Sequence, residues 1–378
     1  MFHRTANTVF LYWPPACLSA SIQQGGKMVD TAKIAKAIVY LRKRAGYTQK
    51  DLADRLGVSD KAVSKWERGL GLPDISFLRK LSILLDTDTD SLLAGDVIHH
   101  DSGWCGVLYL DKNPYGIGLH TIIYDKPLVC FLLGYFLLVG IRKIIIIVSE
   151  EEKAFIHSEF GNGHDWGIDL VCSDSISDTP NIIHTMFSEC SNCMIVYGRS
   201  LIYGVDQTRF FQKAMHNKNR LTVLSLPRGN KAALQRLCFD DNRKIICDGV
   251  SDEVATQYEY YDIPVVFCPA PLITPVFDAI EKGSITENSI LKDQHLYTEV
   301  LDRGFVEIQI DSWDDVADAS GFIRIVQNAC GMNLYCLEEI AWRRGMISSE
   351  KLKELAKRKN NGQVRSYLES LASTAEEN

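Results

Sequence analysis

Apolar residues recur at helical spacing between residues 28 and 95. Over residues 31–44 they fall on one face of a predicted helix, with basic residues largely outside that face: Ile34, Ala37, Ile38 and Leu41 against Lys33, Lys36, Arg42 and Lys43. A second helix is predicted at 49–56 and a third at 59–68, joined by a tight turn at Gly57 and capped by Thr48 and Ser59. Two short helices, 74–85 and 89–94, complete a small helical bundle.

From residue 106 onward the pattern changes, and apolar strand-like runs alternate with helical segments. Strands are predicted at 106–110, 143–148, 168–172 and 194–197, and helices at 127–140, 151–160 and 180–190. Such alternation predicts a largely parallel sheet with helices on both faces. The run at 127–140 is too short to cross a bilayer and is expected to be a buried helix, so no membrane partner is predicted.

A length of 378 residues suits two or three domains. We assign 28–95 to the helical bundle, 96–103 to a linker and 104–372 to the α/β domain, with a tail at 373–378. Residues 1–27 show neither a helical period nor a secretory leader. We expect them to be a disordered tail, or a non-native stretch before a true start at Met28.

Charge is distributed unevenly along the chain. The whole protein carries a formal net charge of −7, whereas residues 33–68 contain ten Lys/Arg and four Asp/Glu. A basic segment on an acidic protein indicates that one module meets a polyanion. Eleven cysteines without a framework spacing favour reduced thiols and a cytoplasmic protein, and the pair Cys190 and Cys193 lacks zinc-ligand partners.

The order Thr48-Gln49, inward Ala53, turn Gly57, cap Ser59, then Val63 and Trp66-Glu-Arg-Gly closely resembles the phage-repressor-like (Cro-type, XRE) helix-turn-helix family. The resemblance implies that the third helix enters the major groove of double-stranded DNA. Five residues could then reach base edges: Ser59, Asp60, Lys61, Ser64 and Lys65. Asp60 could equally serve only to cap the helix.

The same resemblance gives Gln49 a phosphate contact at the N-terminus of the second helix. Further backbone contacts are predicted for Arg42, Lys43 and Arg68. Because such modules gain specific affinity by pairing on two half-sites, we expect the second domain to form a homodimer or a higher homo-oligomer.

The second domain resembles the sugar-1-phosphate nucleotidyltransferases, in particular glucose-1-phosphate thymidylyltransferase. Six phrases carry this resemblance in family order: Tyr124-Asp-Lys-Pro-Leu, Gly140-Ile-Arg-Lys-Ile-Ile-Ile, Gly161-Asn-Gly-His-Asp-Trp-Gly, Leu201-Ile-Tyr-Gly, Ala319-Ser-Gly-Phe-Ile and Cys336-Leu-Glu-Glu-Ile-Ala-Trp-Arg-Arg-Gly. It implies a fold class of α+α/β, in which the helical bundle precedes a Rossmann-like nucleotidyltransferase fold with a C-terminal helical segment.

The family's catalytic groups are expected to be missing. Between residues 106 and 124 the chain is several residues too short for the family's Gly-rich phosphate loop, and the Lys that the family has shortly before its Tyr-Asp-Lys-Pro phrase corresponds to Gly118. One magnesium carboxylate corresponds to Arg199 and the other to Gln309, unless a register shift of two brings in Asp311. We therefore predict no catalytic residue, no metal ligand and no cofactor, magnesium being required only if the alternative of an active nucleotidyltransferase holds.

The family also has a regulatory nucleotide site near its subunit interface. This chain retains the corresponding residues: Tyr203, Gly204, Glu339, Ile340 and Arg343. They could bind a deoxythymidine nucleotide or nucleotide-sugar, with Tyr203 stacking and Arg343 binding phosphate. Alternatively, the segment only packs subunits together and Glu339 only pairs with Arg343. The sequence thus predicts a DNA-binding transcriptional regulator with a sensor domain.

Overall fold

The computed structural model describes residues 30–44, 47–85, 92–93, 103–216, 220–227, 237–239, 243–248, 260–283, 285, 296–359 and 361–374. The chain divides into two compact units, Met1–Val97 and Ile98–Asn378. The expected tail at 1–27, residues 96–102 of the expected linker and residues 375–378 lie outside the described part, as does most of the helix expected at 89–94.

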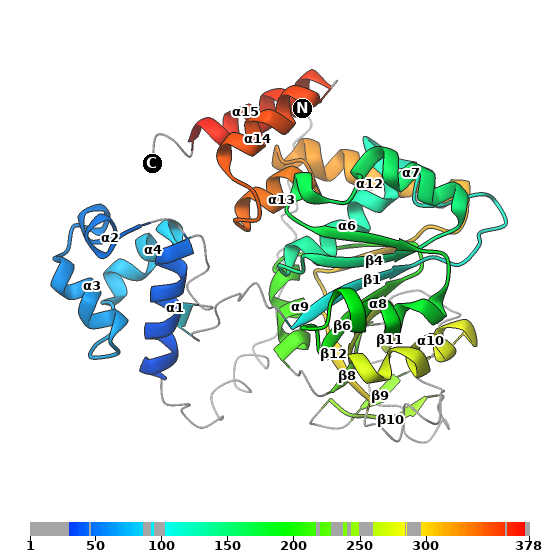
Figure 1. Ribbon diagram of the computed structural model, residues 1–378, viewed down its shortest axis with the longest axis horizontal. Coiled ribbons are helices and arrows are strands. Elements are labelled where there is room, and N and C mark those ends of the chain that lie inside the picture. Colours follow the sequence, from blue (N-terminus) through cyan, green and yellow to red (C-terminus); the bar gives the residue numbers. More distant parts are fainter. Residues whose placement is uncertain are drawn as a thin grey trace, which may run out of the picture. The chain divides into compact units, whose positions relative to one another are not determined.

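The first unit contains the predicted helices α1 (Thr31–Arg44), α2 (Gln49–Leu56), α3 (Asp60–Glu67) and α4 (Ile75–Leu84), drawn in blue in Figure 1. Their apolar faces meet in one core that includes Ile38, Leu52, Val63 and Trp66. The helical periodicity of the sequence therefore predicted these four helices and, for α1, α2 and α3, the side that each buries.

Local side-chain chemistry sets the α2–α3 turn. Thr48 and Asp51 form a capping box at the start of α2, in which each side chain accepts a hydrogen bond from the other residue's backbone N–H. Gly57 ends α2 with a φ of 76°, a conformation that costs glycine little. Ser59 then caps α3 by accepting a hydrogen bond from the Ala62 N–H.

The second unit is built on a seven-stranded sheet with the order β12-β8-β11-β6-β1-β4-β5. Its strands are β1 (Trp104–Tyr109), β4 (Lys143–Ile147), β5 (Asp169–Ser173), β6 (Asn192–Tyr197), β8 (Leu221–Pro227), β11 (Tyr260–Pro269) and β12 (Leu296–Val300). Strand β11 runs antiparallel to both its neighbours, and the other pairs are parallel. The prediction of a largely parallel sheet is confirmed, with one reversed strand.

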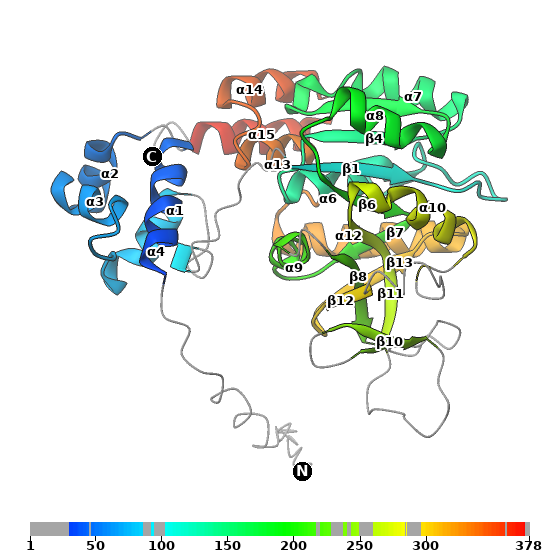
Figure 2. The same ribbon diagram turned by 60° about the horizontal axis from the view of Figure 1, so that its bottom comes forward.

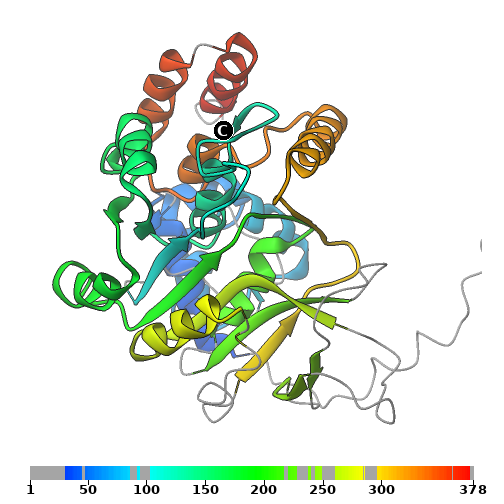
Figure 3. The ribbon, with the colours of Figure 1, turned by 90° about the vertical axis from the view of Figure 1, so that its right-hand side faces the viewer.

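Helices cover both faces of this sheet (Figures 1 and 3). Along β1, Trp104 and Leu108 point into one apolar core and Cys105 and Val107 into the other. The first core is covered by α6 (Leu128–Leu138), α7 (Glu150–Phe160), α9 (Gln207–His216), α12 (Trp313–Cys330) and α13 (Leu337–Arg343), and the second by α8 (Thr179–Met186) and α10 (Ile273–Glu281). Helix α6 is the predicted buried helix, and none of the described helices has the length and hydropathy needed to span a membrane.

A two-stranded ribbon lies beside α12 (Figure 2). It pairs β7 (Ser200–Tyr203) antiparallel with β13 (Val306–Gln309). The remaining elements are the short pairs β2 (Ile122–Ile123) with β3 (Lys126–Pro127) and β9 (Leu237–Phe239) with β10 (Ile245–Asp248), and the C-terminal helices α14 (Ser349–Arg358) and α15 (Gly362–Thr374). Because Arg199 immediately precedes β7, the ribbon fixes it next to the end of β1.

Candidate functional site

The outward side of α3 carries the residues predicted to read DNA. Lys61 and Lys65 are exposed, as are Ser59 and Asp60, and Ser64 is half-buried. The Asp60 carboxylate accepts a hydrogen bond of 2.8 Å from the Lys61 backbone N–H. This contact is a local one within the first turn of α3, as expected if Asp60 helps to cap the helix.

Arg42, which was predicted to contact the DNA backbone, is largely buried within the first unit. Only 8% of this residue is exposed. Its guanidinium donates two hydrogen bonds to the Glu67 carboxylate and one, of 2.6 Å, to the Tyr47 carbonyl. The guanidinium thus joins α1 to the end of α3, and a DNA-backbone contact by Arg42 stays a prediction.

Glu67 also accepts a hydrogen bond of 2.6 Å from the Gln49 side-chain amide. Arg42, Glu67 and Gln49 thus form one network that holds Gln49 at the start of α2. Glu67 was missed by the sequence reasoning, although it is the Glu of the Trp66-Glu-Arg-Gly phrase. The other predicted backbone contacts, Lys43 and Arg68, are exposed.

A cavity of about 870 Å³ lies in the second unit at the end of β1 and β6. Its described lining residues are Tyr109, Asp111, Tyr197, Gly198, Arg199, Ser200, Tyr261, Asp262, Pro264, Ile280, Glu281, Gly283, Ile285, Glu307, Gln309 and Asp311. Arg199 and Gln309, which the resemblance placed at the metal-binding positions, line this cavity, and so does Asp311, the alternative under a register shift of two.

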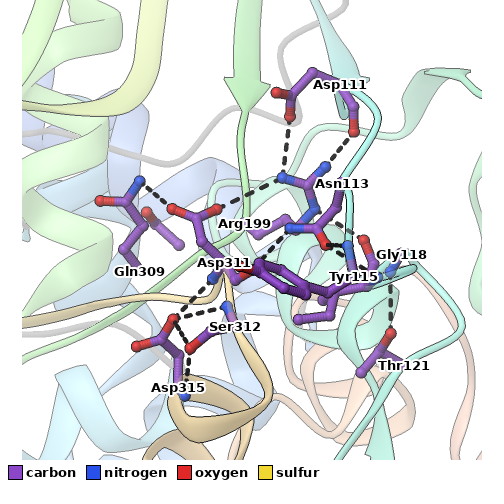
Figure 4. Close-up of polar contacts among 12 residues, drawn as sticks. Asp111, Asn113, Tyr115, Gly118, Thr121, Arg199, Gln309, Asp311, Ser312 and Asp315 are labelled. Carbon is purple, nitrogen blue, oxygen red and sulfur yellow. Dashed lines mark hydrogen bonds and ion pairs between the residues drawn. The ribbon is translucent and has the colours of Figure 1, made fainter.

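Arg199 occupies the centre of this group, as Figure 4 shows. The residue is 5% exposed. Its Nη1 lies 3.0 Å from Oδ1 of Asp111 and 3.6 Å from Oδ1 of Asp311. The guanidinium also donates hydrogen bonds to two backbone carbonyls, those of Ile117 and Asp111. A fixed cation therefore stands between two carboxylates.

The loop after β1 turns its polar groups inward. The Gly118 N–H donates to the Thr121 hydroxyl at 3.0 Å, and the Leu119 N–H donates to the Glu152 carboxylate at 2.7 Å. Meanwhile the loop presents the carbonyls of Asp111 and Ile117 to Arg199. A phosphate needs N–H donors, and these two amides are already occupied within the protein.

The two carboxylate positions near β13 differ in chemistry. Gln309 donates a hydrogen bond of 2.7 Å to the Asp311 carboxylate. Burial raises the pKa of Asp311, although the Arg199 guanidinium acts in the opposite direction. Among the residues that the structure describes, no three His, Cys, Asp or Glu side chains come together in a way that could hold a metal ion.

The predicted regulatory residues lie on β7, the segment after it and α13. The Arg343 guanidinium donates a hydrogen bond of 2.7 Å to Glu339, which also accepts one of 2.7 Å from the Tyr367 hydroxyl. The ring of Tyr203 packs edge-on against Phe322 at 5.7 Å. A side chain at Gly204 would collide with Phe305, and Ile340 packs against the apolar core. The ion pair expected under the purely structural alternative is therefore present.

Comparisons with known proteins found similar sequences for the helix-turn-helix region and for the second unit. Residues 38–92 match the family described as "Helix-turn-helix". A glucose-1-phosphate thymidylyltransferase from Neisseria meningitidis is 29% identical over 258 residues, which cover 65% of this chain and 88% of that protein. The enzyme of the same name from Neisseria gonorrhoeae is 26% identical over 258 residues, with the same coverage of 65% and 88%.

A solved structure from Bacillus anthracis, assigned as a glucose-1-phosphate thymidylyltransferase and determined in complex with a sucrose, is 13% identical. It covers 58% of this chain and 94% of its own, with a TM-score of 0.46. Residues 38–92 thus form a Cro-type helix-turn-helix domain, and most of the rest of the chain is a glucose-1-phosphate thymidylyltransferase-like region.

Proposed function

We propose that this protein is a sequence-specific DNA-binding transcriptional regulator whose nucleotidyltransferase-like region has lost nucleotidyl transfer. The single observation that carries the loss is the position of Arg199 between Asp111 and Asp311. Magnesium would have to approach these carboxylates against a buried guanidinium that already pairs with both of them.

Nucleotidyl transfer also requires N–H donors and cations around the triphosphate, because charge develops there in the transition state. Here the loop amides of Gly118 and Leu119 are bonded to Thr121 and Glu152. Each missing contact of this kind typically costs about 3–4 kcal/mol of transition-state stabilisation. The loss of several such contacts together would reduce the rate of nucleotidyl transfer below a useful level.

We further propose that the region dimerises the protein and senses a deoxythymidine nucleotide or nucleotide-sugar. The ligand would bind at Tyr203, Gly204, Glu339, Ile340 and Arg343. The exposed Arg343 guanidinium supports this, since its side chain is 52% exposed and lies beside the ring of Trp342. A phosphate of the ligand would then replace Glu339 as a partner of Arg343. If the ligand binds the DNA-binding and the non-binding arrangement of the protein with different affinities, that difference would set the change in DNA binding.

A coupled experiment tests these proposals with the purified full-length protein. Preferred DNA is first selected from a random pool, and its binding is then measured with and without thymidine triphosphate and thymidine-diphosphate glucose. Pyrophosphate release from thymidine triphosphate, glucose 1-phosphate and magnesium is assayed in parallel. We expect selection of a defined sequence, no pyrophosphate, and ligand binding that Arg343→Ala removes.

Each part of the proposal has its own contrary result. Pyrophosphate release above the protein-free control would establish the enzyme reading that the relatives' names suggest. Binding to all DNA sequences alike would remove the role as a specific regulator. Calorimetry showing no heat with either nucleotide, or an unchanged signal in Arg343→Ala, would remove the proposed sensor site and leave a dimerisation platform.

A further inference from the structure

The cavity described above has a strongly negative lining. Five carboxylates contribute to it: Asp111, Asp262, Glu281, Glu307 and Asp311. Among the described lining residues Arg199 is the only cation, and its guanidinium is already bound to Asp111 and Asp311. A low-dielectric cavity of one charge sign raises the local concentration of ligands of the opposite sign. Polyanions are disfavoured in this cavity.

Asp262 is the carboxylate that most needs a partner. It lies on β11, and no described side chain forms an ion pair or hydrogen bond with its carboxylate, whose one hydrogen bond comes from its own backbone N–H. Burial raises the pKa of Asp262. Burial, together with the negative charge of Asp262, also raises the pKa of Tyr197, which lines the same cavity. Asp262 is half-buried and lines the cavity, so a positive group that enters the cavity could pair with this carboxylate.

The described residues of this cavity offer no three-ligand cluster for a metal ion, although five carboxylates line it. An organic ligand with its positive charge on ammonium groups fits such a lining better than a single metal ion does. Three tyrosine rings, those of Tyr109, Tyr197 and Tyr261, line the same space. Aromatic faces attract organic cations, with about 0.5–2 kcal/mol for each well-placed contact.

We propose that this cavity binds an organic amine, with Asp262 as the counter-ion of an ammonium group and the tyrosine rings packing on its carbon chain. A cavity of about 870 Å³ lies within the usual size range of small-molecule sites. This inference goes beyond the proposed function, because it concerns a ligand of opposite charge at a separate site, and it holds whether or not a nucleotide binds near Arg343.

The test uses the full-length protein with two probes, putrescine and spermidine, and with glucose as an uncharged comparison. Calorimetric titration at physiological salt is expected to give saturable binding of the amines and none of glucose. Asp262→Asn keeps the shape of the side chain and removes its charge, so it should weaken amine binding by about tenfold or more, which corresponds to about 1.4 kcal/mol. Asp278→Asn, an exposed carboxylate on α10 outside the cavity lining, is the matched control and should bind as the parent does.

Thermal unfolding provides a second readout that does not depend on the titration. Because no described side chain pairs with Asp262, Asp262→Asn should fold at least as stably as the parent, and spermidine should raise the Tm of the parent more than that of the variant. The proposal is overturned if neither amine binds. It is also overturned if Asp262→Asn and Asp278→Asn weaken binding equally, because the amines would then be held by the general negative field of the protein.

Discussion

Arg199 is the residue on which the local structure of the cavity depends most. Its guanidinium joins the loop after β1 to the segment before α12 through Asp111, Ile117 and Asp311. We expect Arg199→Met to lower the free energy of unfolding by about 1–3 kcal/mol, because two carbonyls lose their donor. The cost stays below that of a fully buried pair, since the Asp111 and Asp311 side chains are 67% and 52% exposed and can be rehydrated.

Urea denaturation followed by circular dichroism measures this change. Arg209→Met, at an exposed position on α9, supplies the control and should alter the stability by less than about 0.5 kcal/mol. Equal midpoints for the parent and Arg199→Met would mean that the guanidinium contributes nothing net to this fold.

The DNA-reading residues separate into two kinds. Lys61→Ala and Lys65→Ala remove exposed cations from α3, so we expect each to weaken binding to the selected sequence more than binding to unrelated DNA. Gln49→Ala removes a donor at the start of α2 that Glu67 orients, so it should weaken binding evenly across sequences. Competition assays with selected and scrambled duplexes measure both effects, and a panel without loss at any of the three positions would contradict the docking.

The partners of single side chains were predicted only where they are close in the sequence, and Arg42 shows the reason. Its position on α1 and its charge were compatible with a phosphate contact. In the structure the Arg42 guanidinium donates to Glu67, which is 25 positions away in the sequence. Short-range patterns locate caps such as Thr48 and Ser59, because a cap depends on the next three residues. Partners distant in the sequence, like Asp111 for Arg199, leave no such pattern.

At the scale of elements, periodicity was informative wherever burial is one-sided. Helix α2 begins and ends at the predicted residues, and α6 was correctly expected to be a buried helix. The antiparallel direction of β11 and the pairing of β7 with β13 were not predicted. Strand direction and pairing depend on contacts between distant segments. The apolar pattern of a strand is the same whether the strand lies parallel or antiparallel to its neighbours.

An ion pair joins α13 to the end of α14. The Lys359 ammonium lies 2.6 Å from the Glu338 carboxylate, which is 5% exposed. Burial acts to raise the pKa of Glu338, but the neighbouring Lys359 outweighs it and the pKa is lowered. A lowered pKa contributes stability that is complete above the unfolded value of about 4.3 and is lost as the pH falls through the folded value.

We therefore expect Glu338→Gln to be less stable than the parent at pH 7, and the difference to shrink as the pH falls from about 5 to 3. Thermal unfolding across this pH range measures the difference. Glu369→Gln, an exposed position on α15, serves as the reference and should follow the parent throughout. A difference that stays constant with pH would mean that the variant acts through packing and not through the charge of Glu338.

At the scale of the whole molecule, the two units differ in the charge they present to ligands. The basic stretch at 33–68 belongs to the helix-turn-helix unit, and the rest of the chain brings the total to −7. The acidic cavity of the second unit and the basic face of α3 should not compete for one polyanion. DNA is expected to bind through the first unit, with an affinity that falls steeply with salt.

A single helix-turn-helix unit buries little DNA surface, so the proposed dimer has a geometric consequence. Two copies related by a two-fold axis would read two inverted half-sites whose centres lie about 10 base pairs, or a multiple of one helical turn, apart. Footprinting on the selected DNA should show this symmetry, and sedimentation of the free protein should give twice the mass of one chain. Inserting five base pairs between the half-sites turns one to the opposite side of the duplex and should abolish tight binding, whereas inserting ten should restore much of it. Tight binding of one full-length chain to an isolated half-site would contradict the dimer and, with it, the role we assign to the second unit in DNA recognition.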